Sequence, residues 1–206
     1  MSPRPDVSTE RKNQILNAAM RVFARRGFHK ARMDDIAAES HLSKGALYLY
    51  FRSKDAIIQA LARKLFDVEL RALRRAASER RPAPARLRAL ARHVLDSMSL
   101  WQPFLPVLHE FYAFATRPGP VRAALQDYYR QYSQALAALI TEGIERGELC
   151  PGDPNLLART VIAQFEGLLL LWVVAPQTFD LSTQWLPMAE HLIHSMETCP
   201  SKEKSQ

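Results

Sequence analysis

The side chains best suited to recognisable chemistry lie together in one short run, SKGALYLYF, from Ser43 to Phe51. A hydroxyl, an ammonium and two phenols follow one another there, interrupted by a residue that has no side chain. Lys44 could reach a phosphate or a base edge, and Tyr48 and Tyr50 could donate hydrogen bonds to phosphate oxygens. For one of the two tyrosines, packing inside the protein is an equally good interpretation.

Two short helices must hold these groups in place. The spacing of Ile36 and Ala37 predicts a helix over residues 34–40, followed by a tight turn. Ser43 can cap the next helix, expected over residues 44–50, because its hydroxyl can accept from a backbone N–H that has no partner in the first turn. This layout is that of a helix-turn-helix, whose second helix enters the major groove of DNA.

Within this second helix, the remaining residues divide between the groove and the protein interior. Gly45 lets the backbone approach the groove closely, and Ala46 can offer a methyl contact to thymine. Leu47 and Phe51 are expected to pack inward and hold the helix in place.

The charge of the chain favours the same segment. The formal net charge of the 206 residues is +7, and residues 1–64 hold thirteen Lys and Arg against six Asp and Glu. Residues 65–206 hold fifteen of each sign, so the whole excess lies in the N-terminal part. A basic surface there would attract phosphates and would make DNA binding fall steeply with salt.

Apolar residues recur at helical spacing along the rest of the chain, and prolines and glycines separate the segments. No alternation typical of strands and no internal repeat is present. The sequence therefore predicts an all-α fold of about nine helices. Besides the two helices above, those expected cover residues 9–26, 54–80, 85–100, 101–116, 121–146, 155–175 and 182–196.

No motif predicts catalysis. The sequence has no glycine-rich phosphate loop, no set of metal ligands and no nucleophile in a recognisable setting. His191 and His194 have a spacing that could bind a metal, but no third ligand is in view, so a surface or interface pair is the better interpretation. We expect no catalytic residue, no metal and no cofactor.

The cysteines and the apolar segments bear on the compartment. Cys150 and Cys199 are far apart in the sequence and form no CxxC pair, so we expect free thiols, which fit a reducing compartment. The N-terminus has no apolar secretory segment. The most apolar run, from Leu168 to Ala175, is too short to span a bilayer. These features predict a cytoplasmic protein that does not enter a membrane.

Two stretches, ILNAAMRVFARRGF and DDIAAESHLSKGALYLYFRSKDAII, resemble the DNA-binding domain of the tetracycline-repressor (TetR) family. The resemblance implies a homodimeric transcriptional regulator, usually a repressor. It also implies a DNA-binding domain over residues 1–53, a ligand-binding and dimerisation domain over residues 54–206, and a phosphate contact by Lys54. The expected DNA-contact residues are Arg32, Met33, Ser43, Lys44, Gly45, Ala46, Tyr48, Tyr50 and Lys54.

The chain departs from this family pattern at two places. Many relatives cap the second helix with Thr or Ser where Ala31 and Arg32 stand, so that cap is lost here unless Asp34 replaces it. Arg32 could instead touch a phosphate or a guanine edge, or be solvated. His41 stands where glycine is common, and histidine is among the residues enriched in the left-handed backbone region.

Aromatic residues gather in the segments that would surround a ligand cavity in the C-terminal domain. Apolar pockets with a few polar groups are the usual way to hold small ligands. The alternative is that these aromatics fill an ordinary core, and only the resemblance favours a cavity. The expected ligand contacts are Trp101, Phe104, His109, Phe111, Tyr112, Tyr128, Tyr132, Gln164, Phe165, Leu168 and Trp172.

Four polar residues interrupt apolar helical faces: His109, Glu110, Gln164 and Glu166. A buried polar group needs a partner, so each could orient a ligand, and either glutamate could hold a cationic one. The alternatives are ion pairs with arginines or exposure to solvent.

The last two expected helices are apolar over more than one face and must be covered. Pairing with their copies across a two-fold axis would give a four-helix bundle, which is where the family places its dimer. The expected interface residues are Leu157, Val161, Leu169, Val173 and Leu192.

These features together predict a repressor that binds a palindromic double-stranded operator and is released by a small apolar or amphipathic effector. Its two helix-turn-helix units would occupy successive major grooves, roughly 34–36 Å apart. The alternative is a DNA-anchored helical protein whose C-terminal domain binds a protein partner instead of a small ligand.

Overall fold

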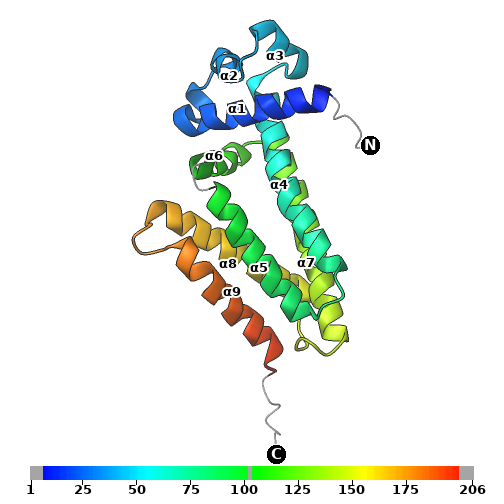
Figure 1. The fold of residues 1–206 in the computed structure, drawn as a ribbon. Coiled ribbons are helices and arrows are strands. Elements are labelled where there is room, and N and C mark those ends of the chain that lie inside the picture. The colour runs from blue at the N-terminus through cyan, green and yellow to red at the C-terminus, as the bar shows by residue number, and fades with distance from the viewer. Residues whose placement is uncertain (1–6, 102–103, 200–206) are drawn as a thin grey trace, which may run out of the picture. The chain divides into compact units, whose positions relative to one another are not determined.

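The computed structural model describes residues 7–101 and 104–199. Within these ranges the chain forms nine α-helices and no strand, which confirms the predicted all-α fold (Figure 1). The helices are α1 (Val7–Lys30), α2 (Met33–Glu39), α3 (Lys44–Tyr50), α4 (Lys54–Ser78), α5 (Ala83–Trp101), α6 (Leu105–Ala115), α7 (Pro120–Glu145), α8 (Pro154–Val174) and α9 (Leu181–Glu197).

Several helix ends follow from single residues of the sequence. The Ser53 hydroxyl accepts from the N–H of Ala56 at 3.1 Å and caps α4. Asp153 caps α8 in the same way, through the N–H of Asn155 at 2.9 Å. Gly147 follows α7 with a φ of 70°, in the left-handed region that suits a glycine after a helix. The helices therefore begin and end close to the predicted residues.

Helix α1 differs from its prediction, which ended it at Arg26. Gly27 has a φ of 70° and a ψ of 164°, and the chain resumes a helical path after it up to Lys30. The glycine therefore makes a kink inside α1 instead of ending it, because only a residue without a Cβ adopts this conformation readily.

The chain divides into two compact units that differ from the expected domains over residues 1–53 and 54–206. Unit 1 comprises residues 1–67 and 101–127, and unit 2 comprises residues 68–100 and 128–206. Unit 1 thus contains α6 and the first part of α4, in addition to the helix-turn-helix.

The core of unit 1 explains why α6 belongs to it. Phe28, just after the kink in α1, packs edge-on against Phe111 and Phe114 of α6, with ring centroids 5.0 and 5.4 Å apart. The carboxylate of Glu110, also in α6, accepts the backbone N–H of Phe28. An apolar cluster and a polar contact therefore join α6 to the kinked end of α1.

Unit 2 is a bundle of α5, α7, α8, α9 and the end of α4. Its helices approach closely at Gly143 of α7, where a Cβ would lie 2.6 Å from the Cβ of Ala83 and 2.7 Å from Leu149 Cδ1. The buried side chains of its core are Leu73, Ala83, Leu87, Leu90, Leu136, Ala137, Leu139, Ile140, Leu149, Ala158, Ile193 and Met196.

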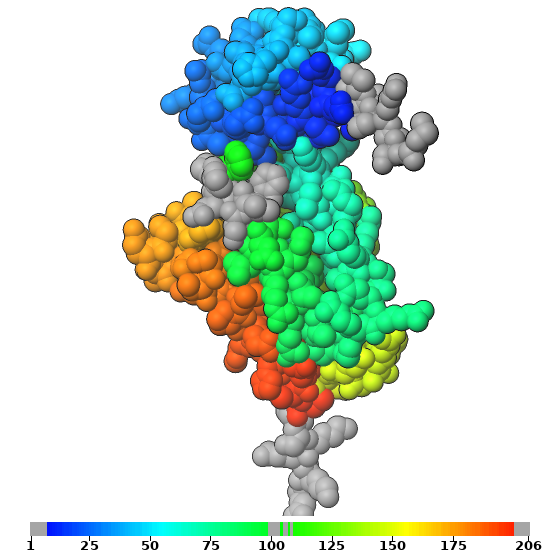
Figure 2. Space-filling view, in the orientation of Figure 1, coloured from blue at the N-terminus to red at the C-terminus, as the bar shows by residue number. Residues whose placement is uncertain are grey.

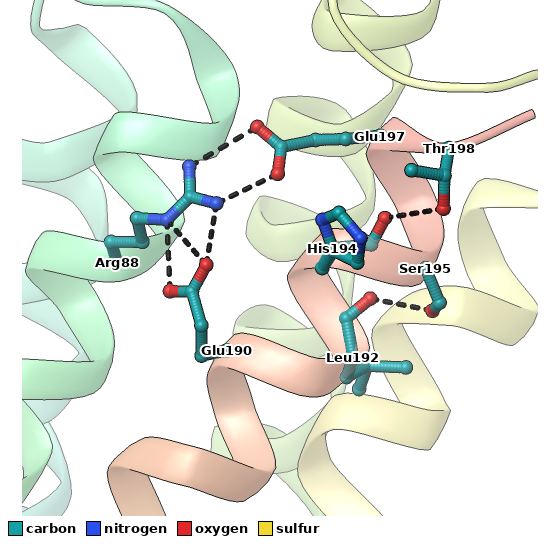
Figure 3. A network of polar contacts seen from close by, with 7 residues as sticks. All are labelled: Arg88, Glu190, Leu192, His194, Ser195, Glu197 and Thr198. Carbon is teal, nitrogen blue, oxygen red and sulfur yellow. Dashed lines mark hydrogen bonds and ion pairs between the residues drawn. The ribbon is translucent and has the colours of Figure 1, made fainter.

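Polar contacts at the end of α9 tie it to α5 (Figure 3). The guanidinium of Arg88 in α5 lies between two carboxylates of α9, with Nη2 2.6 Å from Glu190 Oε1 and 2.7 Å from Glu197 Oε2. Hydrogen bonds from Arg88 hold the pKa of Glu190 below its ordinary value. The same bonds raise the pKa of Arg88.

The expectation of free thiols is wrong. Cys150, between α7 and α8, forms a disulfide with Cys199, just after α9, and their Cα atoms lie 5.2 Å apart. The backbone N–H of Cys150 also donates to the carbonyl oxygen of Met196 at 2.6 Å. The fold brings together two residues separated by 49 positions, a proximity that no local pattern reports.

Helix α8 has the predicted length but is apolar over more of it than expected. The apolar segment is not limited to residues 168–175, since α8 has 21 residues with a mean hydropathy of 1.6 over its most apolar stretch. By length and composition alone it could cross a bilayer, and only a small share of it is buried within this chain. Much of its apolar surface is therefore exposed in a single copy of the chain.

Candidate DNA-binding surface and ligand cavity

The orientation of α3 is set by its buried side chains. Ser43 caps the helix by accepting the N–H of Ala46 at 3.1 Å, as predicted. Leu47 is fully buried and Phe51 nearly so, which confirms that these two residues pack inward. The opposite side of α3 is consequently exposed, and Figure 2 shows the surface that α2 and α3 contribute in light blue to cyan.

The exposed side of α3 carries most of the predicted DNA contacts. Lys44, Gly45 and Tyr48 are exposed, while Ala46 and Tyr50 are half-buried. A Cβ added to Gly45 would meet nothing within 4 Å, so the backbone is open to an incoming surface there.

Leu49 was missed by the sequence reasoning, although it is the most exposed large apolar side chain of the helix-turn-helix, at 85%. Its position in α3, two residues after the buried Leu47, was the available signal, because it places Leu49 away from the core.

Helix α2 begins after Arg32 without a side-chain cap, so the cap is lost as expected, and Asp34 does not replace it. The backbone N–H of Arg32 donates to Asp35 Oδ2 at 2.9 Å, which ties the residue before the helix to its first turn. Arg32 itself is exposed and Met33 is half-buried. At the other end of α2, His41 has a φ of 54°, which confirms the expected left-handed turn residue.

Lys44 forms an ion pair with Asp34 across the turn. Its Nζ lies 2.8 Å from Asp34 Oδ1, and both side chains are more than half exposed. The hydrogen bond to Asp34 raises the pKa of Lys44, so the ammonium stays charged. Ion pairs as exposed as this are weak, so a phosphate can compete for the lysine.

Lys54 has partners inside unit 1. Its Nζ lies 2.5, 3.1 and 3.0 Å from the carbonyl oxygens of Phe28, His29 and Ala31, respectively. These three bonds use all the N–H donors of the ammonium. Lys54 therefore joins the start of α4 to the end of α1, and any contribution to DNA binding in this arrangement is indirect.

Arginines of α1 fix α2 in the same unit. Arg21 and Arg25 both bind the carboxylate of Glu39, and their hydrogen bonds lower the pKa of that carboxyl. Arg26 Nη1 lies 2.9 Å from Asp35 Oδ1. These contacts lower the net charge that the three arginines present to a phosphate.

The predicted ligand residues fall into two groups. Phe104 and Phe111 lie in unit 1, with His109 and Tyr112 of α6, whose rings are 6.4 Å apart. Trp101 lies at the end of α5, and its side chain is outside the described residues. The residues in unit 2 are Tyr128, Tyr132, Gln164, Phe165, Leu168 and Trp172.

A small apolar cavity lies inside unit 2, and only Tyr132 and Gln164 of the predicted ligand residues line it. The sequence reasoning missed the contribution of α9, whose Trp185 is buried on the stripe that also holds Leu181 and Ala189. The four-residue spacing of Leu181, Trp185 and Ala189 in the sequence was the signal that they share one side of the helix. The lining residues are Leu87, Leu90, Ala91, Val94, Tyr132, Val161, Gln164, Trp185, Ala189, Leu192 and Ile193.

Two of the polar residues considered as ligand contacts have partners of their own. Glu166 accepts a hydrogen bond from the Tyr129 hydroxyl at 2.6 Å, and Glu110 accepts from Phe28 as described above. A glutamate that the sequence reasoning did not single out, Glu69 of α4, is half-buried with Oε2 3.5 Å from His93 Nε2, and desolvation raises its pKa.

The residues expected at the dimer interface are mostly inside unit 2. Leu169 is buried in its own chain, and the half-buried Val161 and Leu192 line the cavity. Leu157 packs against the core, and Val173 is exposed. Val173 is therefore the most accessible of the five, and their place in a dimer interface stays a prediction.

Two profiles of known protein families match this chain. The family profile described as "Bacterial regulatory proteins, tetR family" matches residues 15–61. The profile described as "BetI-type transcriptional repressor, C-terminal" matches residues 83–196, which is more than half of the chain.

Individual proteins agree with these profiles. The HTH-type transcriptional regulator YfiR of Bacillus subtilis is 29% identical over 157 residues, or 75% of this chain and 76% of its own. A regulator from Saccharomonospora viridis in complex with choline superposes with a TM-score of 0.79 at 24% identity, covering 90% of this chain and 96% of its own. SmeT is the repressor of a Stenotrophomonas maltophilia efflux pump. Its complex with triclosan superposes with a TM-score of 0.74 at 22% sequence identity, covering 87% of this chain and 90% of its own. The chain thus belongs to the TetR family of bacterial transcriptional regulators.

Proposed function

We propose that this protein is a transcriptional repressor that binds a palindromic operator as a homodimer and leaves it when a small effector binds. The observation that carries the proposal is the exposed side of α3, where Lys44, Gly45 and Tyr48 point away from a core fixed by Leu47 and Phe51. Such a protein works on chromosomal DNA, so we propose a cytoplasmic location.

Each group on this surface suits a different part of a DNA duplex. Lys44, at the N-terminus of α3, can exchange its exposed partner Asp34 for a phosphate or a guanine edge. Arg32 and Tyr48 can reach phosphates on either side, and Leu49 can meet a thymine methyl group. The full set that we propose adds Met33, Ser43, Gly45, Ala46 and Tyr50 as direct contacts and Lys54 as an indirect one.

A second copy of the chain is the proposed cover for the exposed side of α8. Six exposed residues follow one another along this helix at steps of three or four, and the middle ones are small enough for two helices to approach closely. A bilayer is the poorer cover, because Arg159 and Glu166 interrupt the same helix. The six residues are Leu156, Thr160, Ala163, Gly167, Leu170 and Val174.

The cavity of unit 2 is the proposed effector site. It is closed on most sides by apolar side chains, and its volume of about 40 Å³ is far below the 300–1,000 Å³ of a pocket that holds a drug-sized ligand. An effector must therefore push the walls apart, so it binds one state of unit 2 better than the other. This difference in affinity is what could shift the protein away from its DNA-binding state.

Selection of operators from random duplex DNA by the full-length protein tests the proposal. We expect a palindrome with half-sites one helical turn apart, bound by a dimer in sedimentation analysis. Lys44→Ala should weaken binding to that palindrome and reduce its preference over random DNA, while Arg71→Ala, an exposed arginine of unit 2, should change neither.

Failure to select any sequence at physiological salt would refute the proposal. If a palindrome is selected but no small molecule releases it, while a protein co-purifies on the C-terminal part, the alternative of a protein-binding domain would be favoured.

A further inference from the structure

The polar atoms around the cavity of unit 2 are unevenly satisfied. Trp185 Nε1 donates to the carbonyl oxygen of Ala91 at 2.8 Å, and Gln164 Nε2 donates to that of Met188 at 3.2 Å. The other end of the same amide, Gln164 Oε1, is buried and has no hydrogen-bond partner. Each of these two lining side chains therefore has a donor in use, and the acceptor of Gln164 is left open.

The charged groups near the cavity are negative, as is the partial charge on the open acceptor Gln164 Oε1. Burial, followed by the negative charges of Glu69 and Glu166, raises the pKa of Tyr132, which lines the cavity. Glu69 Oε2 is itself buried without a hydrogen-bond partner. A carboxylate ligand would meet this negative charge and lose its hydration, so an anion is disfavoured.

The cavity also disfavours a cation. None of its eleven lining residues carries a charged side chain, so an ammonium would be buried with no carboxylate in contact to balance its charge. A neutral molecule that is mostly apolar avoids both costs. Eight of the eleven lining residues are leucine, isoleucine, valine or alanine, so a largely apolar molecule meets mostly aliphatic walls.

We propose that the effector of this protein is an uncharged, largely apolar molecule with one N–H or O–H group, which donates a hydrogen bond to Gln164 Oε1. This rests on the proposed function, in which the same cavity is the effector site. A buried acceptor left unpaired is costly, whereas an acceptor that gains a donor is satisfied. Gln164 therefore determines specificity by selecting ligands that carry a donor.

The matched probes are indole, which has one N–H donor, and benzothiophene, which has nearly the same shape and no donor. Benzothiophene-2-carboxylate adds the disfavoured negative charge. Binding to the full-length dimer is measured by calorimetry and by thermal shift. We expect indole to bind about tenfold more tightly than benzothiophene, and the carboxylate not to bind.

Two variants identify the residue responsible. Gln164→Met keeps the side-chain length and removes the acceptor, so it should bring the two neutral probes to equal affinity. Leu192→Met changes another wall of the cavity but keeps the amide, so the preference for indole should persist. Circular dichroism and operator binding of both variants show that they fold.

The outcomes separate this proposal from the proposed function. Equal affinity of indole and benzothiophene for the natural protein, a preference that survives in Gln164→Met, or no binding of any probe overturns the donor requirement, even if operator binding is normal. Absence of operator binding by the natural protein refutes the proposed function instead, whatever the probes do.

Discussion

Replacement of Gly27 by alanine tests how α6 is joined to the kinked end of α1. The φ of 70° with a ψ of 164° at Gly27 lies in a region that essentially only glycine adopts, so an L residue there costs about 1–3 kcal/mol. The new Cβ would also lie 2.4 Å from Glu110 Oε1, a distance that no real contact allows. Glu110 must then swing away and give up the N–H of Phe28, and leaving that group unpaired costs about 1–3 kcal/mol more.

A double-mutant cycle separates these two costs. Glu110→Leu alone removes the acceptor of the Phe28 N–H, so it should destabilise the protein by about 1–3 kcal/mol. In the Glu110→Leu background the alanine has no carboxylate to displace, and only the backbone strain remains. The combined effect should therefore be smaller than the sum of the single effects by about 1–2 kcal/mol.

The measurement is the free energy of unfolding in urea for the four proteins, together with their affinity for the selected operator. Glu110→Gln is the matched control, because its amide oxygen can still accept from Phe28. We expect it to retain most of the stability that Glu110→Leu loses. Additive effects of Gly27→Ala and Glu110→Leu would show that the two residues do not interact and would refute this account.

Four further predictions concern unit 2. Gly143→Ala should lower the free energy of unfolding by about 1–3 kcal/mol, and with it the urea midpoint, because the new Cβ would overlap two neighbouring side chains. An unchanged midpoint would mean that α7 can shift to make room. Glu69→Gln should raise Tm at pH 7 but not near pH 4, because the raised pKa of Glu69 makes its ionised form unfavourable in the folded state above that pKa. Glu190→Gln should lower Tm at pH 7, because it removes the ion pair with Arg88 that lowers the pKa of Glu190. The loss in the free energy of unfolding should be less than about 1 kcal/mol, because the pair is exposed. This loss should vanish at pH 3, since the stabilisation is present above the ordinary pKa of 4.5 and disappears as pH falls through the lower folded value. Cys150→Ser should lose about 4 kcal/mol without reductant, the chain-entropy value for a 49-residue loop, and reductant should bring the natural protein to the same Tm.

The sequence predicted those features that depend on neighbours along the chain. Helical spacing gave the helices to within a few residues, and Ser43 gave the start of α3, because cap residues act locally. Leu47 and Phe51 were placed correctly in the interior for the same reason, since both lie on the inward side of one short helix.

The features that were missed depend on contacts between distant segments. The kink at Gly27 matters because α6, more than seventy residues later, supplies Glu110 to it. The disulfide and the contribution of Trp185 to the cavity likewise join helices that no local pattern connects. The exposed side of α8 could not be predicted because an apolar helix offers several stripes, and only its packing within unit 2 shows which remains open.

The independence of the two sides of α3 has a consequence for how such a regulator could acquire new targets. Leu47 secures the helix from within, whereas the side chains of Tyr48 and Leu49 are 41% and 85% exposed, and a Cβ at position 45 would meet no obstacle. Changes at these three positions can therefore redirect the protein to other promoters without eroding its folding. Libraries randomised there should be rich in foldable variants and are a practical starting point for retargeting.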